Sequence, residues 1–123
     1  MATLLFVYGT LKRGCRNHPL LANQAYVGPA RTTPGFTVYD LGGYPGLVAA
    51  AADAPGVAGE VWSVDAECLA ALDTFEGVAE GLYRREPLAL QAPYDRQRVD
   101  AYVYGREISG RPHVGTEWRE PRR

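Results

Sequence analysis

Thr3-Leu4-Leu5-Phe6-Val7-Tyr8, a continuous apolar run that stops at Gly9, is the stretch that decides the fold. A short apolar run ended by a turn residue is typical of a strand that is buried on both faces. We therefore predict such a strand over residues 3–8. The polar, glycine-containing stretch that follows, residues 12–19, predicts a loop, and residues 19–23 predict a short helix.

Turn signals cut the rest of the chain into short segments. They lie at Pro34-Gly35, Gly42-Gly43, Pro45-Gly46 and Pro55-Gly56, where glycine and proline favour changes of chain direction. Between and beyond these turns, short apolar or alternating segments predict strands. These segments are residues 25–32, 36–41, 47–51, 59–64, 83–90 and 99–104.

The segment that begins at Asp65 and ends at Phe75 carries a clear helical pattern. Asp65 is a suitable N-cap, and Leu69 and Leu72 recur with Phe75 at every third residue on one face. Gly77 supplies the stop just past the helix. Many short strands around one principal helix indicate an α+β domain built on a strongly curled or closed mixed β-barrel, with short flanking helices.

The 123 residues show no break in composition, so we predict a single domain over residues 1–123. Apolar residues make up 46% and charged residues 22%, the balance of a globular protein rather than of a disordered or fibrous one. The last part, residues 105–123, contains three glycines and two prolines. This composition predicts an irregular tail.

Charge and hydropathy narrow the classes of partner. The formal net charge is −1, which gives no general field for attracting nucleic acid or anionic lipid. No apolar stretch approaches the roughly 20 residues of a membrane span. We therefore expect a soluble, cytoplasmic protein with neither a membrane nor a nucleic-acid partner.

Cys15 and Cys68 are the only cysteines, and they lie far apart and outside any metal-ligand spacing. This pattern indicates two reduced thiols. The alternative is catalysis by Cys15, since the neighbouring Arg13 and Arg16 can lower the pKa of its thiol.

The first candidate site is Tyr8-Gly9-Thr10-Leu11-Lys12-Arg13-Gly14, directly after the predicted buried strand. A glycine at a strand end lets the backbone approach a ligand closely, and consecutive N–H groups there bind anions or polarised carbonyls. The spacing of the glycines and the lysine fits neither nucleotide-binding signature. Taken alone, the segment favours a plain turn, because a strand followed by glycine is common.

The second candidate site is Leu72-Asp73-Thr74-Phe75-Glu76-Gly77, at the end of the predicted helix. A helix C-terminus disfavours an anion, and desolvation beside the bulky Phe75 raises the pKa of a carboxylate. Both effects make Glu76 a better proton acceptor near neutral pH. Taken alone, the segment favours a solvated glutamate in a loop.

Together these segments resemble the γ-glutamylcyclotransferase-like family, and most closely its γ-glutamylamine cyclotransferase branch. The resemblance rests on five short motifs that keep the family's order and spacing from about residue 4 to residue 104. They are Tyr8-Gly9-Thr10-Leu11-Lys12-Arg13-Gly14, Asn17-His18, Gly59-Glu60-Val61, Leu72-Asp73-Thr74-Phe75-Glu76-Gly77 and Tyr83-Arg84-Arg85. Each motif is modestly specific, and their ordered combination is strongly so.

The resemblance implies a compact β-barrel with flanking helices and neither a metal nor an organic cofactor. It implies that the Tyr8-Gly9-Thr10-Leu11 stretch binds the γ-glutamyl part of a small-molecule substrate, partly through backbone N–H groups. Glu76 would be the general acid/base as the substrate's α-amine attacks its own γ-carbonyl and releases 5-oxoproline and an amine. The N–H groups would bind either the α-carboxylate or the oxygen of the tetrahedral intermediate, and they would share one cavity with Glu76.

Further polar residues take secondary places in this interpretation. Tyr104, at the end of a predicted strand, either points its hydroxyl into the substrate pocket or packs in the core. The Tyr44-Pro45-Gly46 turn is expected to border the site. Arg85 is expected to serve the structure by pairing with Asp73 or another carboxylate.

Two other functions compete with catalysis by Glu76. The same fold would serve a non-catalytic module that binds a γ-glutamyl ligand, or a small scaffold that contacts proteins through its arginine-rich tail. The presence of Glu76 argues against the binding module, because binding alone requires no base. His18 as a base and Glu60 as a second acid are alternatives more typical of surface or packing positions. The leaving group and the oligomeric state stay open.

Overall fold

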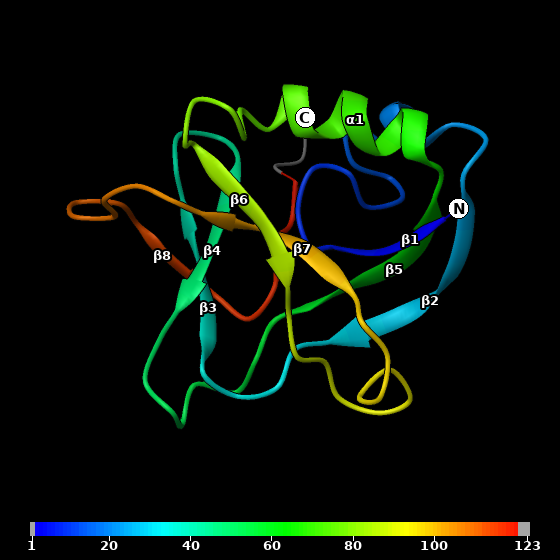
Figure 1. Cartoon of the computed structure of the whole chain (residues 1–123). Coiled ribbons are helices and arrows are strands. Elements are labelled where there is room, and N and C mark those ends of the chain that lie inside the picture. Colours follow the sequence, from blue (N-terminus) through cyan, green and yellow to red (C-terminus); the bar gives the residue numbers. More distant parts are fainter. Residues whose placement is uncertain (1, 121–123) are drawn as a thin grey trace.

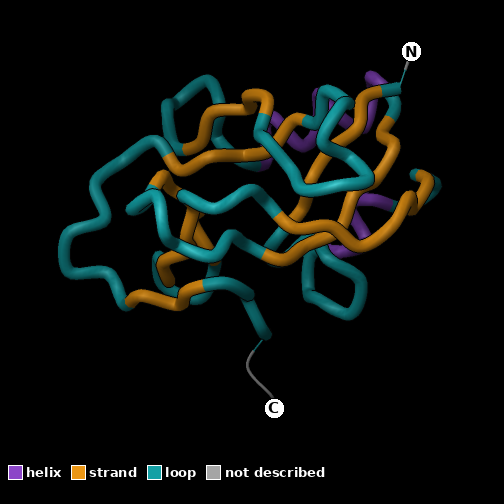
Figure 2. Tube along the Cα trace, turned by 90° about the horizontal axis from the view of Figure 1, so that it is seen from below, coloured by secondary structure: helices purple, strands orange, loops and turns teal. Residues whose placement is uncertain are grey.

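The computed structural model describes residues 2–120, which form one curled eight-stranded sheet with an α-helix across it (Figure 1). The strands are β1 (Thr3–Val7), β2 (Ala25–Arg31), β3 (Phe36–Asp40), β4 (Pro45–Ala49), β5 (Ala58–Val64), β6 (Tyr83–Pro87), β7 (Asp100–Tyr104) and β8 (His113–Gly115). The helices are η1, a 3-10 helix (His18–Leu21), and α1 (Ala66–Phe75). In Figure 2 the strands bend across the molecule instead of lying in one plane.

The curl of the sheet follows from the pairing of β7. β1 pairs antiparallel with β5 on one side and parallel with β7 on the other. β6 pairs antiparallel with β7 along its whole length. On its remaining edge β7 pairs with β1 through Asp100 and Ala101, and with β4 through Val103. β1 and β4 therefore diverge from a shared edge, and the sheet forms a half-barrel, which confirms the predicted curled mixed sheet with one principal helix.

The opening strand is buried on both faces, as predicted. Leu5 and Val7 belong to the apolar cluster that includes Leu69 and Leu72 of α1. Phe6 belongs to a second cluster on the other face of the sheet. Since successive side chains of a strand point to opposite faces, β1 divides the two cores.

The helix α1 begins and ends as its sequence predicts, with one difference. The side chain of Asp65 accepts a hydrogen bond from the Cys68 N–H at 2.8 Å and so caps the first turn. Gly77 has a φ of +68°, the left-handed conformation that favours glycine after a helix. Phe75, predicted on the apolar face of the helix, is instead 49% exposed, because it lies where the helix ends beyond the core.

Most of residues 105–120 is irregular chain, as predicted, but the segment is packed against the sheet and contains one short strand, β8. Strand β8 pairs with β3, and the Ala58 N–H donates to the Thr116 carbonyl at 2.8 Å. Trp118 is only 4% exposed. Burial of this indole and pairing along the edge of β3 hold the segment in place, although its glycines and prolines predict irregular chain. Residues 121–123 lie outside the described residues. Within residues 2–120, neither helix has the length and apolar content that a membrane span requires.

Candidate active site

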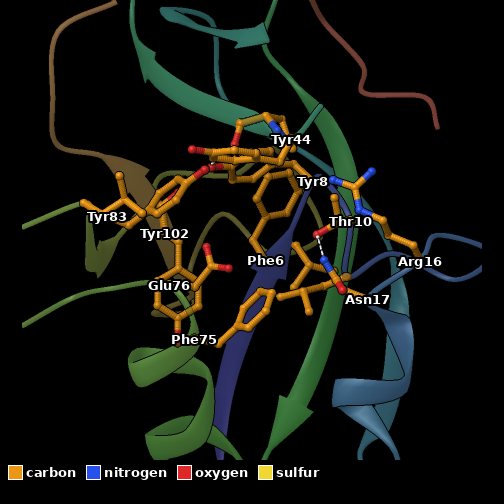
Figure 3. A pocket seen from close by; sticks show the side chains of 15 residues that line it. Phe6, Tyr8, Thr10, Arg16, Asn17, Tyr44, Phe75, Glu76, Tyr83 and Tyr102 are labelled. Atoms are coloured by element: carbon orange, nitrogen blue, oxygen red, sulfur yellow. Dashed lines mark hydrogen bonds between the residues drawn. The ribbon is translucent and has the colours of Figure 1, made fainter. Parts of the chain in front are cut away.

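A cavity of about 240 Å³ lies where β1, α1 and the start of β4 meet (Figure 3). Its walls are largely apolar and aromatic, with a few polar groups. The lining residues are Phe6, Val7, Tyr8, Gly9, Thr10, Leu11, Arg16, Asn17, Tyr44, Pro45, Phe75, Glu76, Leu82, Tyr83 and Tyr102. The stretch after β1 and the residue after α1 therefore share one cavity, as the family resemblance predicts, and it is bordered by Tyr44 and by Pro45, the first residue of β4.

Glu76 lies at the C-cap of α1, and its carboxylate points into the cavity (Figure 3). The Glu76 N–H still donates to the Leu72 carbonyl at 2.8 Å, and Gly77 then turns the chain away. Among residues 2–120 the Glu76 carboxylate has neither a hydrogen-bond donor nor an ion-pair partner, and burial alone raises its pKa from 4.5 to about 7. A carboxylate of this kind both accepts and donates protons near neutral pH.

In the turn from Gly9 to Leu11, carbonyl groups accept hydrogen bonds from the protein, whereas the N–H groups have no acceptor within residues 2–120. The carbonyls of Gly9 and Thr10 accept from the N–H groups of Lys12 and Asn17 at 3.1 and 2.9 Å. Within residues 2–120, no group accepts a hydrogen bond from the N–H of Gly9, Thr10 or Leu11, although all three residues are buried. Since buried N–H groups ordinarily have a partner, these three donors are available to a ligand.

Gly9 is required by a close approach of two loops. A Cβ atom at this position would lie 2.3 Å from Cγ and 3.0 Å from Cδ of Pro45. Contacts this short force the backbone to move. A side chain at Gly9 would therefore displace the turn that carries the three N–H groups.

The Tyr8 side chain bridges β7 and β4 beside the cavity. Its hydroxyl donates to the Tyr102 carbonyl at 2.6 Å and accepts from the Leu47 N–H at 3.2 Å. The hydroxyl thus adds a side-chain link between β7 and β4 next to their backbone pairing at Val103 and Leu47. Burial raises the pKa of Tyr8 far above its ordinary value, so the group stays protonated and acts as part of the wall.

A network of charged side chains ties the end of α1 to β6 and β7. Arg85 donates to both carboxylate oxygens of Asp73, at 2.8 and 3.2 Å, which confirms the predicted pair. Arg85 also donates to the buried Asp100 at 2.7 Å, and the Tyr102 hydroxyl donates to Asp73 at 2.7 Å. Since Asp73 lies three residues before Glu76, this network holds the helix end that positions Glu76.

Tyr104, predicted either to reach the pocket or to pack in the core, is not among the residues that line the cavity. It is buried, and its ring packs edge-on against Tyr83 with centroids 5.6 Å apart. Tyr102 takes the place at the cavity wall. Tyr102 and Tyr104 share one face of β7, so alternation alone does not distinguish them. Neither Arg16 nor Tyr102 is signalled as a lining residue by its sequence context.

The remaining candidates serve packing. Nδ1 of His18 lies 3.0 Å from the Leu11 carbonyl, and its ring packs on Trp62. The Glu60 carboxylate accepts from Arg13 and from the Trp62 indole N–H. Burial raises the pKa of the Cys15 thiol, which is opposite to the effect that a catalytic thiolate requires.

No group of three or more His, Cys, Asp or Glu side chains within residues 2–120 is arranged to hold a metal ion. The polar groups that face the cavity are a carboxylate, hydroxyls, amide groups and one guanidinium. Such a set can bind a zwitterionic molecule and move a proton within it.

Comparisons with known proteins identify relatives of this chain and of its fold. A family model described as gamma-glutamyl cyclotransferase, AIG2-like, matches residues 5–120. A Vibrio cholerae protein, provisionally named a gamma-glutamylcyclotransferase, is 40% identical over 104 residues that cover 85% of this chain and 84% of the relative. The human gamma-glutamylaminecyclotransferase is 39% identical over 123 aligned residues, which cover 84% of this chain and 78% of the human protein.

Solved structures share the fold along nearly the whole chain. An AIG2-like protein from Mus musculus superposes with a TM-score of 0.78 and 28% identity, covering 98% of this chain and 97% of its own. The protein YtfP from Escherichia coli superposes with a TM-score of 0.70 and 31% identity, covering 94% and 95%. The half-barrel and its single principal helix are thus the shared fold of these proteins.

Proposed function

Because the chain belongs to the gamma-glutamyl cyclotransferase, AIG2-like family, we propose that it releases 5-oxoproline and an amine from a γ-glutamyl amide, with Glu76 as the general acid/base. The observation that carries the proposal is the Glu76 carboxylate. It faces the cavity, lacks a partner among residues 2–120, and has a pKa raised to about 7 by burial. The human relative's name, gamma-glutamylaminecyclotransferase, supports γ-glutamylamines among the first compounds to test.

The reaction needs no external nucleophile. Glu76 takes a proton from the substrate's α-ammonium, and the freed lone pair attacks the γ-carbonyl carbon to form the C–N bond of a five-membered ring. The original amide C–N bond then breaks as the departing nitrogen is protonated. The attacking nitrogen loses two protons in all and the departing nitrogen gains two, so a carboxylate that relays them ends the cycle unchanged.

The N–H groups of Gly9, Thr10 and Leu11 supply the other half of the proposal. They bind either the α-carboxylate of the substrate or the oxygen that becomes negative in the tetrahedral intermediate. One oxyanion donor is worth about 2.7–4 kcal/mol of transition-state stabilisation. Folding the extended γ-glutamyl chain into its attack geometry contributes up to roughly 7–11 kcal/mol. A cavity of about 240 Å³ with such fixed donors is suited to both tasks.

The direct test is a set of γ-glutamyl amides scored by 5-oxoproline release, with the wild-type protein and the Glu76→Gln variant. Glutamine keeps the size of the side chain and cannot accept a proton, so we expect turnover to fall about 10²–10⁴-fold. Glu80→Gln is the matched control, because Glu80 is an exposed carboxylate in the same loop.

Two results would contradict the proposal. One is a folded Glu76→Gln protein that keeps wild-type turnover, since the proton relay would then lie elsewhere. The other is a wild-type protein that binds γ-glutamyl amides in calorimetry and releases no 5-oxoproline from any of them. That second result favours the non-catalytic binding module.

A further inference from the structure

We propose that Arg16 selects the leaving group, so that the enzyme favours γ-glutamyl amides whose departing amine carries a carboxylate. This inference rests on the proposed cyclotransferase function and adds the side of the substrate that the reaction itself leaves undefined. The substrate class would be γ-glutamyl amino acids and isopeptides with an acidic group close to the departing nitrogen.

The charges around the cavity are few and well separated. Among the lining residues, Arg16 is the one cationic side chain and Glu76 the one carboxylate. Figure 3 shows the two on opposite sides of the view, with Arg16 beside Thr10 and Asn17. A bound molecule therefore meets the Glu76 carboxylate at one side and, at the other, a guanidinium that is itself paired with Glu120.

The exposure of the lining residues separates an inner part of the cavity from its mouth. The turn from Tyr8 to Leu11 is buried. The side chain of Arg16 is 43% exposed, and Phe75 and Tyr44 are 49% and 36% exposed. The γ-glutamyl half must reach the buried turn and Glu76, so the leaving group extends toward the mouth. There the first charged group that it meets is the guanidinium of Arg16.

Arg16 is held in an orientation that already accepts a carboxylate. Its Nη1 donates to the Glu120 carboxylate at 3.2 Å, and its Nη2 donates to the Gly43 carbonyl. The Arg16 N–H also donates to Glu120, at 3.1 Å. Within residues 2–120 these contacts use two of the five guanidinium N–H groups, and the others can bind a second carboxylate. A guanidinium whose rotamer is fixed loses less entropy on binding, and its planar fork fits a carboxylate well.

Three small substrates differ in the charge of the leaving group, and comparing their ratios between wild type and variant removes the effect of their different sizes. They are γ-glutamyl-alanine, γ-glutamyl-ethylamide and γ-glutamyl-ethylenediamine, whose leaving groups carry a carboxylate, no charge and an ammonium. We measure kcat/KM from 5-oxoproline release for the wild-type protein and for Arg16→Gln. We expect the alanine-to-ethylamide ratio to fall about tenfold in the variant, as for the loss of one charge-assisted hydrogen bond. The ethylenediamine compound should gain relative to ethylamide, because the repelling charge is gone.

Two further variants separate this role from a structural one. Arg16→Lys keeps the charge and loses the fork, so we expect an intermediate alanine-to-ethylamide ratio. Arg13→Gln removes an equal charge from the same loop. Since Arg13 pairs with Glu60 and does not line the cavity, we expect its ratios to match those of the wild type.

The outcomes distinguish this inference from the function on which it rests. Equal losses for all three substrates in Arg16→Gln would overturn it, because Arg16 would then serve the γ-glutamyl half or the fold. Unchanged ratios with full activity would overturn it as well. If the wild-type protein releases 5-oxoproline from none of the three, the proposed function fails and this inference fails with it.

Discussion

Asp73 and Glu76 stand three residues apart at the end of α1, yet their carboxylates have opposite surroundings. Burial alone would raise the pKa of Asp73, but hydrogen bonds from Arg85 and Tyr102 and the charge of Arg85 outweigh it and hold the pKa below its ordinary value of 3.8. Glu76 has no such partner among residues 2–120, and burial raises its pKa to about 7. The end of α1 thus carries one carboxylate that is paired with neighbouring side chains and a second that has no partner among residues 2–120.

If Glu76 is the proton-transfer group that we propose, this difference explains how its carboxylate is positioned without a cation that would lower its pKa. A cation close to Glu76 would position the carboxylate and also lower its pKa, which would weaken it as a base. Here the positioning contacts are made by Asp73, one helical turn earlier, through Arg85 and Tyr102. The proposed base, Glu76, is therefore held through its neighbour Asp73 and keeps a pKa of about 7.

The largest expected effect concerns the stability cost of the free carboxylate. The pKa of the Glu76 side chain is 4.5 in the unfolded chain and about 7 in the folded protein. The folded state therefore resists ionisation of Glu76, and the stability of the wild type falls as the pH rises from 4.5 to about 7. The difference between the two values corresponds to about 3 kcal/mol at most. We expect Glu76→Gln, which cannot ionise, to be more stable than wild type by up to this amount at pH 8 and nearly equal at pH 4.

Urea unfolding at both pH values measures this prediction. Glu80→Gln is the control, and as an exposed substitution it should stay within about 0.5 kcal/mol of wild type at both. A Glu76→Gln protein that is no more stable at pH 8 than at pH 4, relative to wild type, would show that the carboxylate is well solvated.

The next prediction concerns Asp73, the carboxylate that is paired with Arg85. In Asp73→Asn an amide N–H₂ faces the guanidinium of Arg85, and one carboxylate charge is lost from the network. The pair is about a quarter exposed, with side-chain accessibilities of 27% and 28%, so we expect a loss of about 2 kcal/mol. Because the pKa of Asp73 is lowered, this difference should be full above pH 3.8 and shrink as the pH falls further.

The measurement is again urea unfolding, now with Asp95→Asn as the control. Asp95 is exposed, so its substitution should change stability by less than about 0.5 kcal/mol. An Asp73→Asn protein as stable as this control would mean that the network contributes nothing to the helix end.

The third effect appears in the pH dependence of the reaction. If Glu76 must be ionised to accept a proton, kcat/KM rises with pH through about 7. At pH 6 we expect a value about tenfold below the plateau, since about a tenth of the carboxylate is then ionised. Asp73 adds no pH dependence to kcat/KM in this range, because its pKa lies below 3.8 and it is already ionised. A profile that is flat from pH 5 to 8 would remove Glu76 from the role of base.

Local sequence predicts the elements of this fold because their signals are local. Asp65 caps α1, and Gly77 ends it, where the sequence places both. The Pro45-Gly46 turn signal marks instead the first residues of β4. Proline is accepted at the start of a strand, where no N–H is needed.

The features that local sequence does not predict depend on contacts between distant segments. Strand β8 exists because the edge of β3, about 75 residues earlier in the chain, is available for pairing. Trp118 packs in the interior although its neighbours predict an irregular tail. Tyr102 rather than Tyr104 lines the cavity because Tyr104 packs against Tyr83. The shared cavity of Glu76 and the turn after β1 was predicted from the family resemblance, and neither segment indicates it alone.

The hydroxyl of Tyr102 should contribute less than either carboxylate. Tyr102→Phe removes the 2.7 Å hydrogen bond to Asp73 and keeps the ring at the cavity wall, so we expect a loss of about 1 kcal/mol. Tyr39→Phe removes a hydroxyl without a hydrogen bond to residues 2–120 and should cost less. If Tyr102 acts through Asp73, adding Asp73→Asn to Tyr102→Phe costs less than Asp73→Asn costs in the wild type, and the cycle shows coupling. Additive losses would mean that the hydroxyl and the carboxylate stabilise the helix end separately, and Glu76 would then owe its place to Arg85 alone.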